Sequence, residues 1–501
     1  MPVHWTKQFV PMKLKSLDIR NFRCFESYHI GFAPKITIAI GRNGAGKSTV
    51  IDAVKMALSF IFSNNRKLGT DFLSAGNPSL NVRSFSDSDY RYNEKTGTTT
   101  PDASVAGRAI YGKEALEWEL YKRSTANAAL YSTRYQEAFQ KFMHQWKKKG
   151  AALPVIACFS DSFPHKSTKQ TKYALDSINK ERIPLNFGYY QWDLDTACTS
   201  IWETRLCNRL ALQTPLYTRA LRAEAALQEL ADAHNSDTLF ESDEYKRAWE
   251  EQERVSEAFN RLHEETDYVQ KRLVRFSKSL PQLEDEGYVI DYLVAISTDS
   301  GYALNFVFKN GRSKQLKDMA AGYRRLYSIV LDLAYRAYIL NGVKESSGIV
   351  LIDEIDLHLH PSLEQAIVQC LADVFPEMQF IMTSHSAAVI ANLDTSQKVK
   401  DDITGETVPA SRIVFMQEGQ TNAEILPDIY GIDYNAAIRD FMGTASRNEK
   451  IRRIGNEYLT YCSLGLKKEA QTVWDEIIGL IGEDNPYIKE LQDKAEKYEV
   501  H

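Results

Sequence analysis

Short apolar runs and longer amphipathic stretches alternate along the chain. Ile36–Ile40 and Gly348–Ile352 are continuous apolar runs bounded by polar residues, a pattern that predicts strands buried on both faces. Residues 48–62 follow the first run and predict a helix. Residues 103–111 and 116–124 predict two paired antiparallel strands. Together these elements indicate an α/β fold.

Two other segments are strongly helical and rich in charge. Residues 201–280 predict a compact helical hairpin, and residues 446–498 predict a series of C-terminal helices. The predicted organisation is therefore an N-terminal lobe (12–200), a helical insertion (201–280), a C-terminal lobe (281–394) and a mostly helical C-terminal region (395–501).

The segment Gly41–Ser48, directly after the first buried run, reads GRNGAGKS and matches the phosphate-loop pattern G-x-x-x-x-G-K-[ST]. Its glycines let backbone N–H groups turn inward around phosphates, and the following helix presents its N-terminal dipole to them. Lys47 is expected to reach the β- and γ-phosphates, and the Ser48 hydroxyl to bind Mg²⁺. The predicted nucleotide-binding residues are Asn43, Gly44, Ala45, Gly46, Lys47, Ser48 and Thr49.

The second buried run ends in the acidic pair Asp353-Glu354, the form of a Walker B segment. In such a site Asp353 holds Mg²⁺ through water, and Glu354 orients and polarises the attacking water as the catalytic base. A strand that merely ends in surface acids is the alternative, and the phosphate loop in the same chain argues against it. His385 follows a further short apolar strand, where it is predicted to act catalytically by sensing the γ-phosphate.

Composition limits the remaining possibilities. The 501 residues are 44% hydrophobic, enough for a substantial core, and the net charge of −5 does not indicate a general nucleic-acid binder. Basic runs at Lys147–Lys149 and 166–182 leave DNA or RNA contact open, although a solvated face is the favoured interpretation. Neither a signal peptide nor an apolar run of the ~18 residues that a membrane span requires is visible, so a cytoplasmic location is expected.

Metal sites other than the magnesium site are not indicated. The six cysteines lack C-x-x-C spacing and predict neither a disulfide framework nor a zinc site. His358 and His360 could suggest a metal site, but their spacing beside Pro361 fits the loop after the acidic pair better.

The order of phosphate loop, glycine-bearing helix start near Gly322, Asp-Glu strand and Ser-His strand resembles that of ABC-type ATPases. Met12–Arg23 resembles the first strand of the SMC, Rad50 and RecF-like branch. Residues 353–361 (DEIDLHLHP) and 383–386 (TSHS) are similar to the OLD and AAA-15 ATPases of bacterial defence. The chain looks most like the ATPase subunit of Septu-type antiphage systems, a type also found beside retrons.

This resemblance implies an ABC-type ATPase head, in which a mixed sheet with a phosphate-loop core is joined by an antiparallel β-subdomain. It implies ATP and Mg²⁺ as cofactors and Arg23 as a further ATP-binding residue. It also implies a head-to-head homodimer or higher oligomer, in which Gly322 contacts the nucleotide of the opposing subunit. The implied partner is an HNH-type nuclease subunit, and the resemblance leaves contact with nucleic acid open, namely retron RNA or DNA or phage DNA.

Two features depart from the ABC pattern. The usual Leu-Ser-Gly-Gly-Gln signature is replaced by residues 319–323 (MAAGY), and Ala320 has no hydroxyl to offer a γ-phosphate. Arg324 or Arg325 could take over that task. The strand-like segment 154–159 contains no glutamine, so no Q-loop residue is assigned.

Two other functions compete with nuclease control. An OLD-type nuclease needs paired aspartates after its glutamate, and the tail beyond Glu418 contains no D-x-D sequence. A built-in nuclease is therefore rejected. A RecF- or Rad50-like DNA-repair ATPase remains the alternative, and the short hairpin and C-terminal helices favour the defence ATPase over it.

Overall fold

The computed structural model describes residues 9–63, 80–93, 96–125, 128–160, 171–193, 198–233, 242–299, 301–401, 405–441, 448–483 and 485–499. The chain divides after Ile432 into two compact units. The predicted boundary at residue 395 falls inside the first unit, because Ser411–Met416 forms a strand of its central sheet.

The central sheet of the first unit has the strand order β17-β16-β3-β13-β12-β8. Every residue of β3, β8, β12 and β13 is buried, which explains why these strands read as continuous apolar runs. All neighbours are parallel except β17, which is antiparallel to β16. The strands are β3 (Ile36–Gly41), β8 (Val155–Phe159), β12 (Gly348–Ile352), β13 (Met378–Thr383), β16 (Ser411–Met416) and β17 (Glu424–Ile425).

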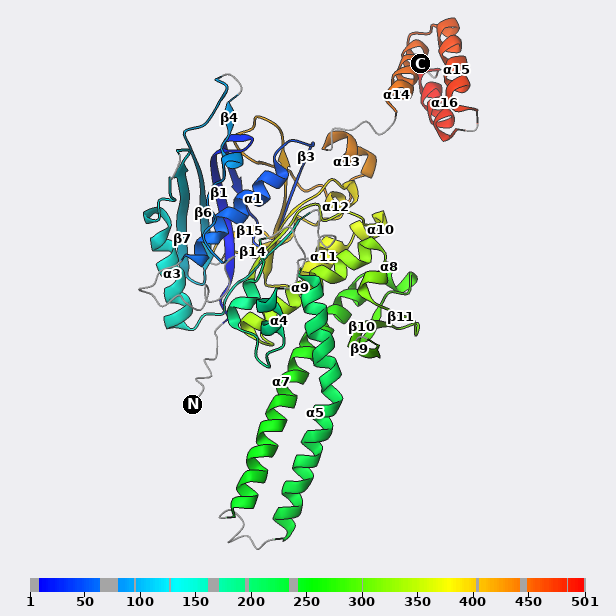
Figure 1. The fold of residues 1–501 in the computed structure, drawn as a ribbon. Helices are drawn as coiled ribbons and strands as arrows, with labels where there is room; N and C mark the ends of the chain where they lie inside the picture. The colour runs from blue at the N-terminus through cyan, green and yellow to red at the C-terminus, as the bar shows by residue number, and fades with distance from the viewer. Residues whose placement is uncertain are drawn as a thin grey trace. The chain divides into compact units, whose positions relative to one another are not determined.

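A second, antiparallel sheet has the order β2-β1-β6-β7 and confirms the predicted strand pair. Its strands are β1 (Met12–Phe22), β2 (Phe25–Gly31), β6 (Asp102–Tyr111) and β7 (Glu114–Arg123). Helix α1 (Lys47–Leu58) contacts strands of both sheets, and α3 (Thr133–Lys149) packs on β7 (Figure 1). The fold is thus the mixed sheet with an antiparallel subdomain that characterises an ABC-type ATPase head.

One buried amide joins the two sheets. Gln379 on β13 is fully buried; its Oε1 accepts from the N–H of Leu14 at 2.7 Å, and its Nε2 donates to the Leu14 and Ala33 carbonyls at 2.8 Å. Because a buried polar group without a partner is costly, these bonds hold β1 against β13 in a single alignment.

The helical insertion is a hairpin of two long helices, α5 (Thr199–Ala233) and α7 (Asp243–Ser279), which project from the sheets (Figure 1). A small antiparallel sheet follows, made of β9 (Ile290–Thr298), β10 (Gly301–Phe308) and β11 (Ser313–Lys314). Helix α9 (Ala321–Asn341) then leads to β12 and is buried along most of its length.

Shorter elements complete the first unit. They are α4 (Lys172–Ile178), α8 (Pro281–Asp285), α10 (Pro361–Glu364), α11 (Ile367–Val374), α12 (Ala387–Ala391), β4 (Tyr92–Asn93), β5 (Thr98–Thr99), β14 (Lys398–Lys400) and β15 (Thr407–Pro409). Single 3₁₀ turns span Ser59–Phe62, Asp87–Asp89, Leu185–Tyr189 and Leu316–Asp318.

The second unit contains four helices among its described residues: α13 (Tyr434–Asp440), α14 (Glu449–Ser463), α15 (Lys467–Ile481) and α16 (Pro486–Glu499). It has a core of its own, formed by Ile454, Val473, Ile477, Ile488 and Leu491. Across the described residues of the whole chain, no helix combines the length and apolar character needed to cross a membrane.

Candidate nucleotide-binding site

Three parallel strands bring the predicted site together. β13 lies between β3 and β12, and Met382 is in register with Ile38 on one side and Ile352 on the other. Because the carboxyl ends of parallel neighbours meet at one edge of a sheet, the phosphate loop, the Ser-His segment and the acidic pair all emerge at the same place.

The phosphate loop is shaped by its glycines. Gly41, Gly44 and Gly46 have φ values of 148°, 85° and 95°, which disfavour residues with a side chain. A Cβ on Gly41 would lie 2.2 Å from the Met416 carbonyl oxygen, whereas a Cβ on Gly44 would meet no atom within 4 Å. The loop is therefore pressed against β16 on one side and open on the other, where a phosphate group fits.

Lys47 is the buried cation of this loop. Its Nζ donates to the carbonyl oxygens of Gly41 at 2.9 Å and Arg42 at 3.0 Å. Burial lowers the pKa of Lys47, and the carboxylates of Asp353, Glu354 and Asp356 oppose that shift. The ammonium group thus lies between the loop backbone and the acidic residues that follow β12.

A threonine hydroxyl organises the acidic pair. Thr383 Oγ1, at the end of β13, donates to Asp353 Oδ1 and accepts from the backbone N–H of Glu354 at 2.8 Å. One Asp353 oxygen is therefore oriented by the protein, and the other accepts no hydrogen bond from the described residues, so it could hold a metal-bound water. Second-layer partners of this kind hold metal-binding carboxylates in position.

Arg325 stabilises the turn that carries Asp353 and Glu354. It is fully buried, and its Nη2 donates to the carbonyl oxygens of Asp353 at 2.8 Å and Glu354 at 3.0 Å. Glu354 has a φ of 50°, and the two carbonyls that converge on one guanidinium compensate for that uncommon backbone conformation. The suggestion that Arg325 contacts the nucleotide of another subunit is wrong, because the side chain is enclosed in its own chain; Arg324 remains the alternative.

A cavity of about 380 Å³ lies where these segments meet. Ten predicted residues line it: Arg23, Asn43, Gly44, Gly46, Lys47, Ser48, Thr49, Asp353, Glu354 and His385. Cys24 and Thr383 also line it; Cys24 follows Arg23 and Thr383 begins the TSHS segment, but neither is among the predicted site residues. Ala45 is buried behind the loop and does not line the cavity.

Arg23 enters the cavity from the turn between β1 and β2. It has a φ of 49°, its Nε donates to Asp89 at 3.0 Å, and its Nη1 donates to Asp52 on α1. The two carboxylates hold the guanidinium at the mouth of the phosphate loop, where it can face a bound nucleotide.

Gly322 lies apart from this cavity, at the start of α9. A Cβ there would lie 2.6 Å from the backbone oxygen of His358, so the absence of a side chain is already required by packing within the chain. The neighbouring Ala320 is exposed and is the N-cap of α9, without a side-chain hydrogen bond to the helix. At this helix start Ala320 is exposed, whereas Gly322 is buried.

His360, the second histidine after the acidic pair, has a structural role at the start of a short helix. His360 caps α10, its Nδ1 accepting from the N–H of Ser362 at 3.3 Å. Among the residues that the structure describes, no group of three or more His, Cys, Asp or Glu side chains is arranged to hold a metal ion.

A phosphate loop, a Walker B turn and a histidine at one edge of a largely parallel sheet define a P-loop ATPase of the ABC and SMC type. The family profile described as AAA ATPase domain (AAA_15) matches residues 12–390. The chain therefore belongs to the AAA_15 family of ATPases.

The chain is also similar to several individual proteins. The chain is 24% identical over 416 residues to the protein named Retron Vc95 probable ATPase of Vibrio cholerae, covering 78% of this chain and 73% of that one. It is 29% identical over 211 residues to Septu protein PtuA of Bacillus mycoides, covering 41% and 26%. A solved Smc head domain from Pyrococcus furiosus aligns with 83% of this chain and 96% of its own at 15% identity, with a TM-score of 0.38.

Replacing Thr383 with Val should lower ATP turnover at limiting Mg²⁺ by about 10–100-fold, because Asp353 loses the hydroxyl that orients it. Steady-state ATPase assays across a magnesium titration measure this. Thr383→Ser is the matched control and should stay near wild type. Wild-type turnover of Thr383→Val at low Mg²⁺ would show that the hydroxyl does not position Asp353.

Proposed function

We propose that the cavity beside β3, β13 and β12 binds ATP with Mg²⁺ and hydrolyses it in the cytoplasm. Lys47, Arg23 and the loop residues 43–49 hold the phosphates, with Ser48 and Asp353 on the magnesium side. The observation that carries this proposal is the convergence of the loop, the acidic pair and His385 on one cavity.

Glu354 is the proposed general base. Asp353 is engaged by Thr383, whereas the Glu354 carboxylate accepts no hydrogen bond from the parts of the chain that the structure describes. A carboxylate that lines the cavity without such a partner can accept a proton from an attacking water. His385, whose backbone N–H donates to Asp356 at 3.2 Å, is placed at the same edge to contact the γ-phosphate.

Replacing Glu354 with Gln should preserve ATP binding and lower turnover by about 10²–10⁴-fold, because the amide cannot accept the proton. Lys47→Ala should instead lose nucleotide binding itself. Equilibrium binding and steady-state ATPase assays on both variants separate the two roles. If Glu354→Gln hydrolyses ATP at the wild-type rate, the base is another group.

The active form is proposed to be a head-to-head dimer. The cavity described above is walled by the phosphate loop and the acidic turn, while the exposed start of α9 at Ala320 lies outside it. Helix N-termini bind anions through unpaired N–H groups. Docking this helix start onto the nucleotide of a second subunit would close each site.

Gly322 is a poor place to test this arrangement, because any side chain there would collide with the His358 backbone of the same chain. Ala320→Asp is better suited, because Asp is a favourable N-cap and still places a negative charge where a partner's phosphate would lie. Lys47→Ala and Ala320→Asp should each be inactive alone. Mixed together they should recover roughly a quarter of wild-type ATPase activity, because half of the dimers then contain one intact composite site. An inactive mixture of correctly folded dimers would indicate that each site is complete within one subunit.

The biological role proposed is control of a separately encoded HNH-type nuclease in antiphage defence. The names of the relatives support this, since they are a retron ATPase and a Septu protein. The second unit, 433–501, is proposed as the docking element for the nuclease. Ile454 belongs to its core and the partly buried Tyr458 and Tyr461 pack against that core, whereas Leu464, Leu466 and Leu480 are exposed.

Deleting residues 433–501 should abolish co-purification with the nuclease encoded beside this gene, and abolish defence, while ATP binding survives. The same result is expected for Leu464→Asp with Leu466→Asp, because exposed apolar side chains are the anchors of such contacts. Affinity capture of a tagged nuclease measures both, with Glu483→Ala as a surface control. If the truncated chain still captures the nuclease, docking belongs to the first unit and the hairpin becomes the next candidate.

A further inference from the structure

A second cavity, here called the cationic cavity, lies at the base of the helical hairpin and has a volume of about 450 Å³. Its walls come from α5, α7, the end of α9 and the segments 181–183 and 342–344. Its lining contains two carboxylates, Glu181 and Glu265, and five cations, namely Arg182, Arg205, Arg209, Arg261 and Lys344. Positive charge is therefore in excess.

The floor of the cationic cavity is a buried cluster of two arginines and one glutamate. Arg205 Nε and Nη2 each donate to Glu265 at 2.7 Å, and the rest of its N–H groups donate to the carbonyls of residues 178, 180 and 181. Arg205 and Glu265 are each 2% exposed. Every N–H of Arg205 is thus engaged, and its charge is matched by the only carboxylate of this floor.

The positive charge of Arg209 is only partly matched by nearby carboxylates. Its Nε donates to the same Glu265 oxygen at 3.1 Å and its Nη2 to the Glu181 backbone oxygen at 3.3 Å, but its Nη1 has no acceptor among the described residues. Burial lowers the pKa of Arg209; Glu265 opposes this shift, and Arg205 adds to it. A buried cation in this position favours an additional anion.

The rim adds more positive charge. Arg261 Nε donates to Glu181 at 2.9 Å and its Nη1 donates to Glu257 at 2.7 Å, so the charge of Arg261 is itself matched by carboxylates. Arg182 and Lys344 are exposed beside it, and Arg182 is the last residue of the basic run 166–182, whose residues 166–170 lie outside the described ranges. The rim therefore places the positive charges of Arg182 and Lys344 beside the buried floor.

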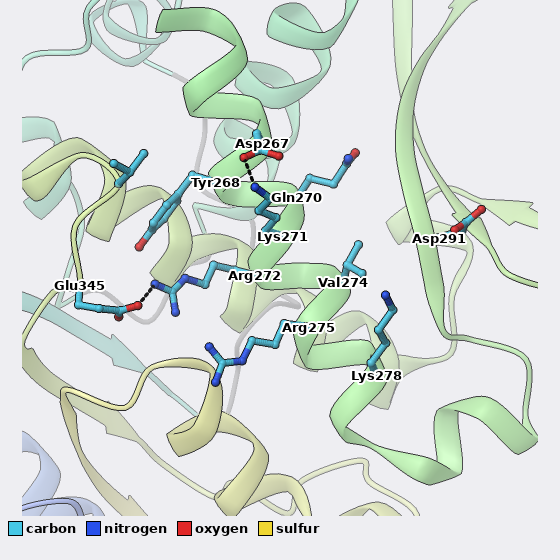
Figure 2. A pocket seen from close by; sticks show the side chains of 11 residues that line it. Asp267, Tyr268, Gln270, Lys271, Arg272, Val274, Arg275, Lys278, Asp291 and Glu345 are labelled. Atoms are coloured by element: carbon cyan, nitrogen blue, oxygen red, sulfur yellow. Dashed lines mark hydrogen bonds and ion pairs between the residues drawn. The ribbon is translucent and has the colours of Figure 1, made fainter. Parts of the chain in front are cut away.

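A neighbouring cavity provides a contrast (Figure 2). This cavity, of about 820 Å³, is lined by four cations and three carboxylates, and Lys271 pairs with Asp267 and Arg272 with Glu345, each at 2.7 Å. Its charges are nearly balanced within the cavity. Arg275 and Lys278 on the wall of this second cavity belong to α7. Replacing them removes the same amount of charge as replacing one arginine and one lysine of the cationic cavity, so they serve as matched controls.

We propose that the cationic cavity binds a phosphate group of a ligand other than the ATP held by the phosphate loop, with Arg209 below and Arg182 and Lys344 at the rim. Phosphate oxygens accept charge-assisted hydrogen bonds from guanidinium groups, often in pairs, and the excess positive charge suits more than one phosphate. Two sources share this chemistry, a free polyphosphate such as a nucleotide and the phosphorylated end of a nucleic-acid strand.

The test uses the full-length chain carrying Lys47→Ala, which weakens the nucleotide site. Inorganic tripolyphosphate and a single-stranded DNA 12-mer with a 5′-phosphate are titrated separately by calorimetry. Adding Arg182→Gln with Lys344→Gln should weaken binding of the probe that resembles the natural ligand, tripolyphosphate or the DNA strand, by about tenfold or more, because two positive charges are lost. The arm that responds identifies the source.

Adding Arg275→Gln with Lys278→Gln removes the same charge next door and should change affinity by less than about twofold, as expected for residues outside the site. Thermal melting confirms that both exposed double variants remain folded. The proposal is overturned if neither probe binds, or if the two double variants weaken binding equally, which would indicate only a general attraction between charges.

Discussion

The site depends on one constraint, the parallel alignment of β3, β13 and β12. These strands come from positions 36–41, 378–383 and 348–352, and their register brings their carboxyl ends to the same edge. The phosphate loop, the acidic pair and His385 are useful together only at that edge. The Gln379 amide is hydrogen-bonded to the backbones of Leu14 and Ala33 and so holds β13 against β1 of the antiparallel sheet. Because Arg23 directly follows β1, this contact also positions Arg23 at the cavity.

Helix α9 links the nucleotide cavity to the hairpin. At its start, Gly322 approaches the His358 backbone, and Arg325 binds the carbonyls of Asp353 and Glu354. Further along, Asp332 accepts from Trp202 on α5 at 2.7 Å and also pairs with Arg336. Because these polar groups are buried, their hydrogen bonds hold the hairpin base in one position relative to the acidic turn.

The end of α9 lines the cationic cavity, so the helix that contacts the acidic turn through Arg325 also forms part of that second cavity. The hairpin base and α9 thus form a continuous packed connection within the first unit, while the second unit has a core of its own.

The sequence by itself determined the elements whose signals are local. The phosphate loop is a contiguous pattern set by glycine geometry, and the buried strands are contiguous apolar runs. The hairpin and the C-terminal helices follow from helical periodicity. Because the motifs are contiguous, ten of the predicted site residues do line one cavity. Only the tertiary structure decided what depends on distant contacts. Thr383 orients Asp353 because β13 is the neighbour of β12. Arg325 is buried against the acidic turn and does not reach a subunit interface. Residues 411–416 join the central sheet although they follow the predicted boundary. The cationic cavity collects charges from separate segments, whose excess over the carboxylates exists only once those segments are packed together.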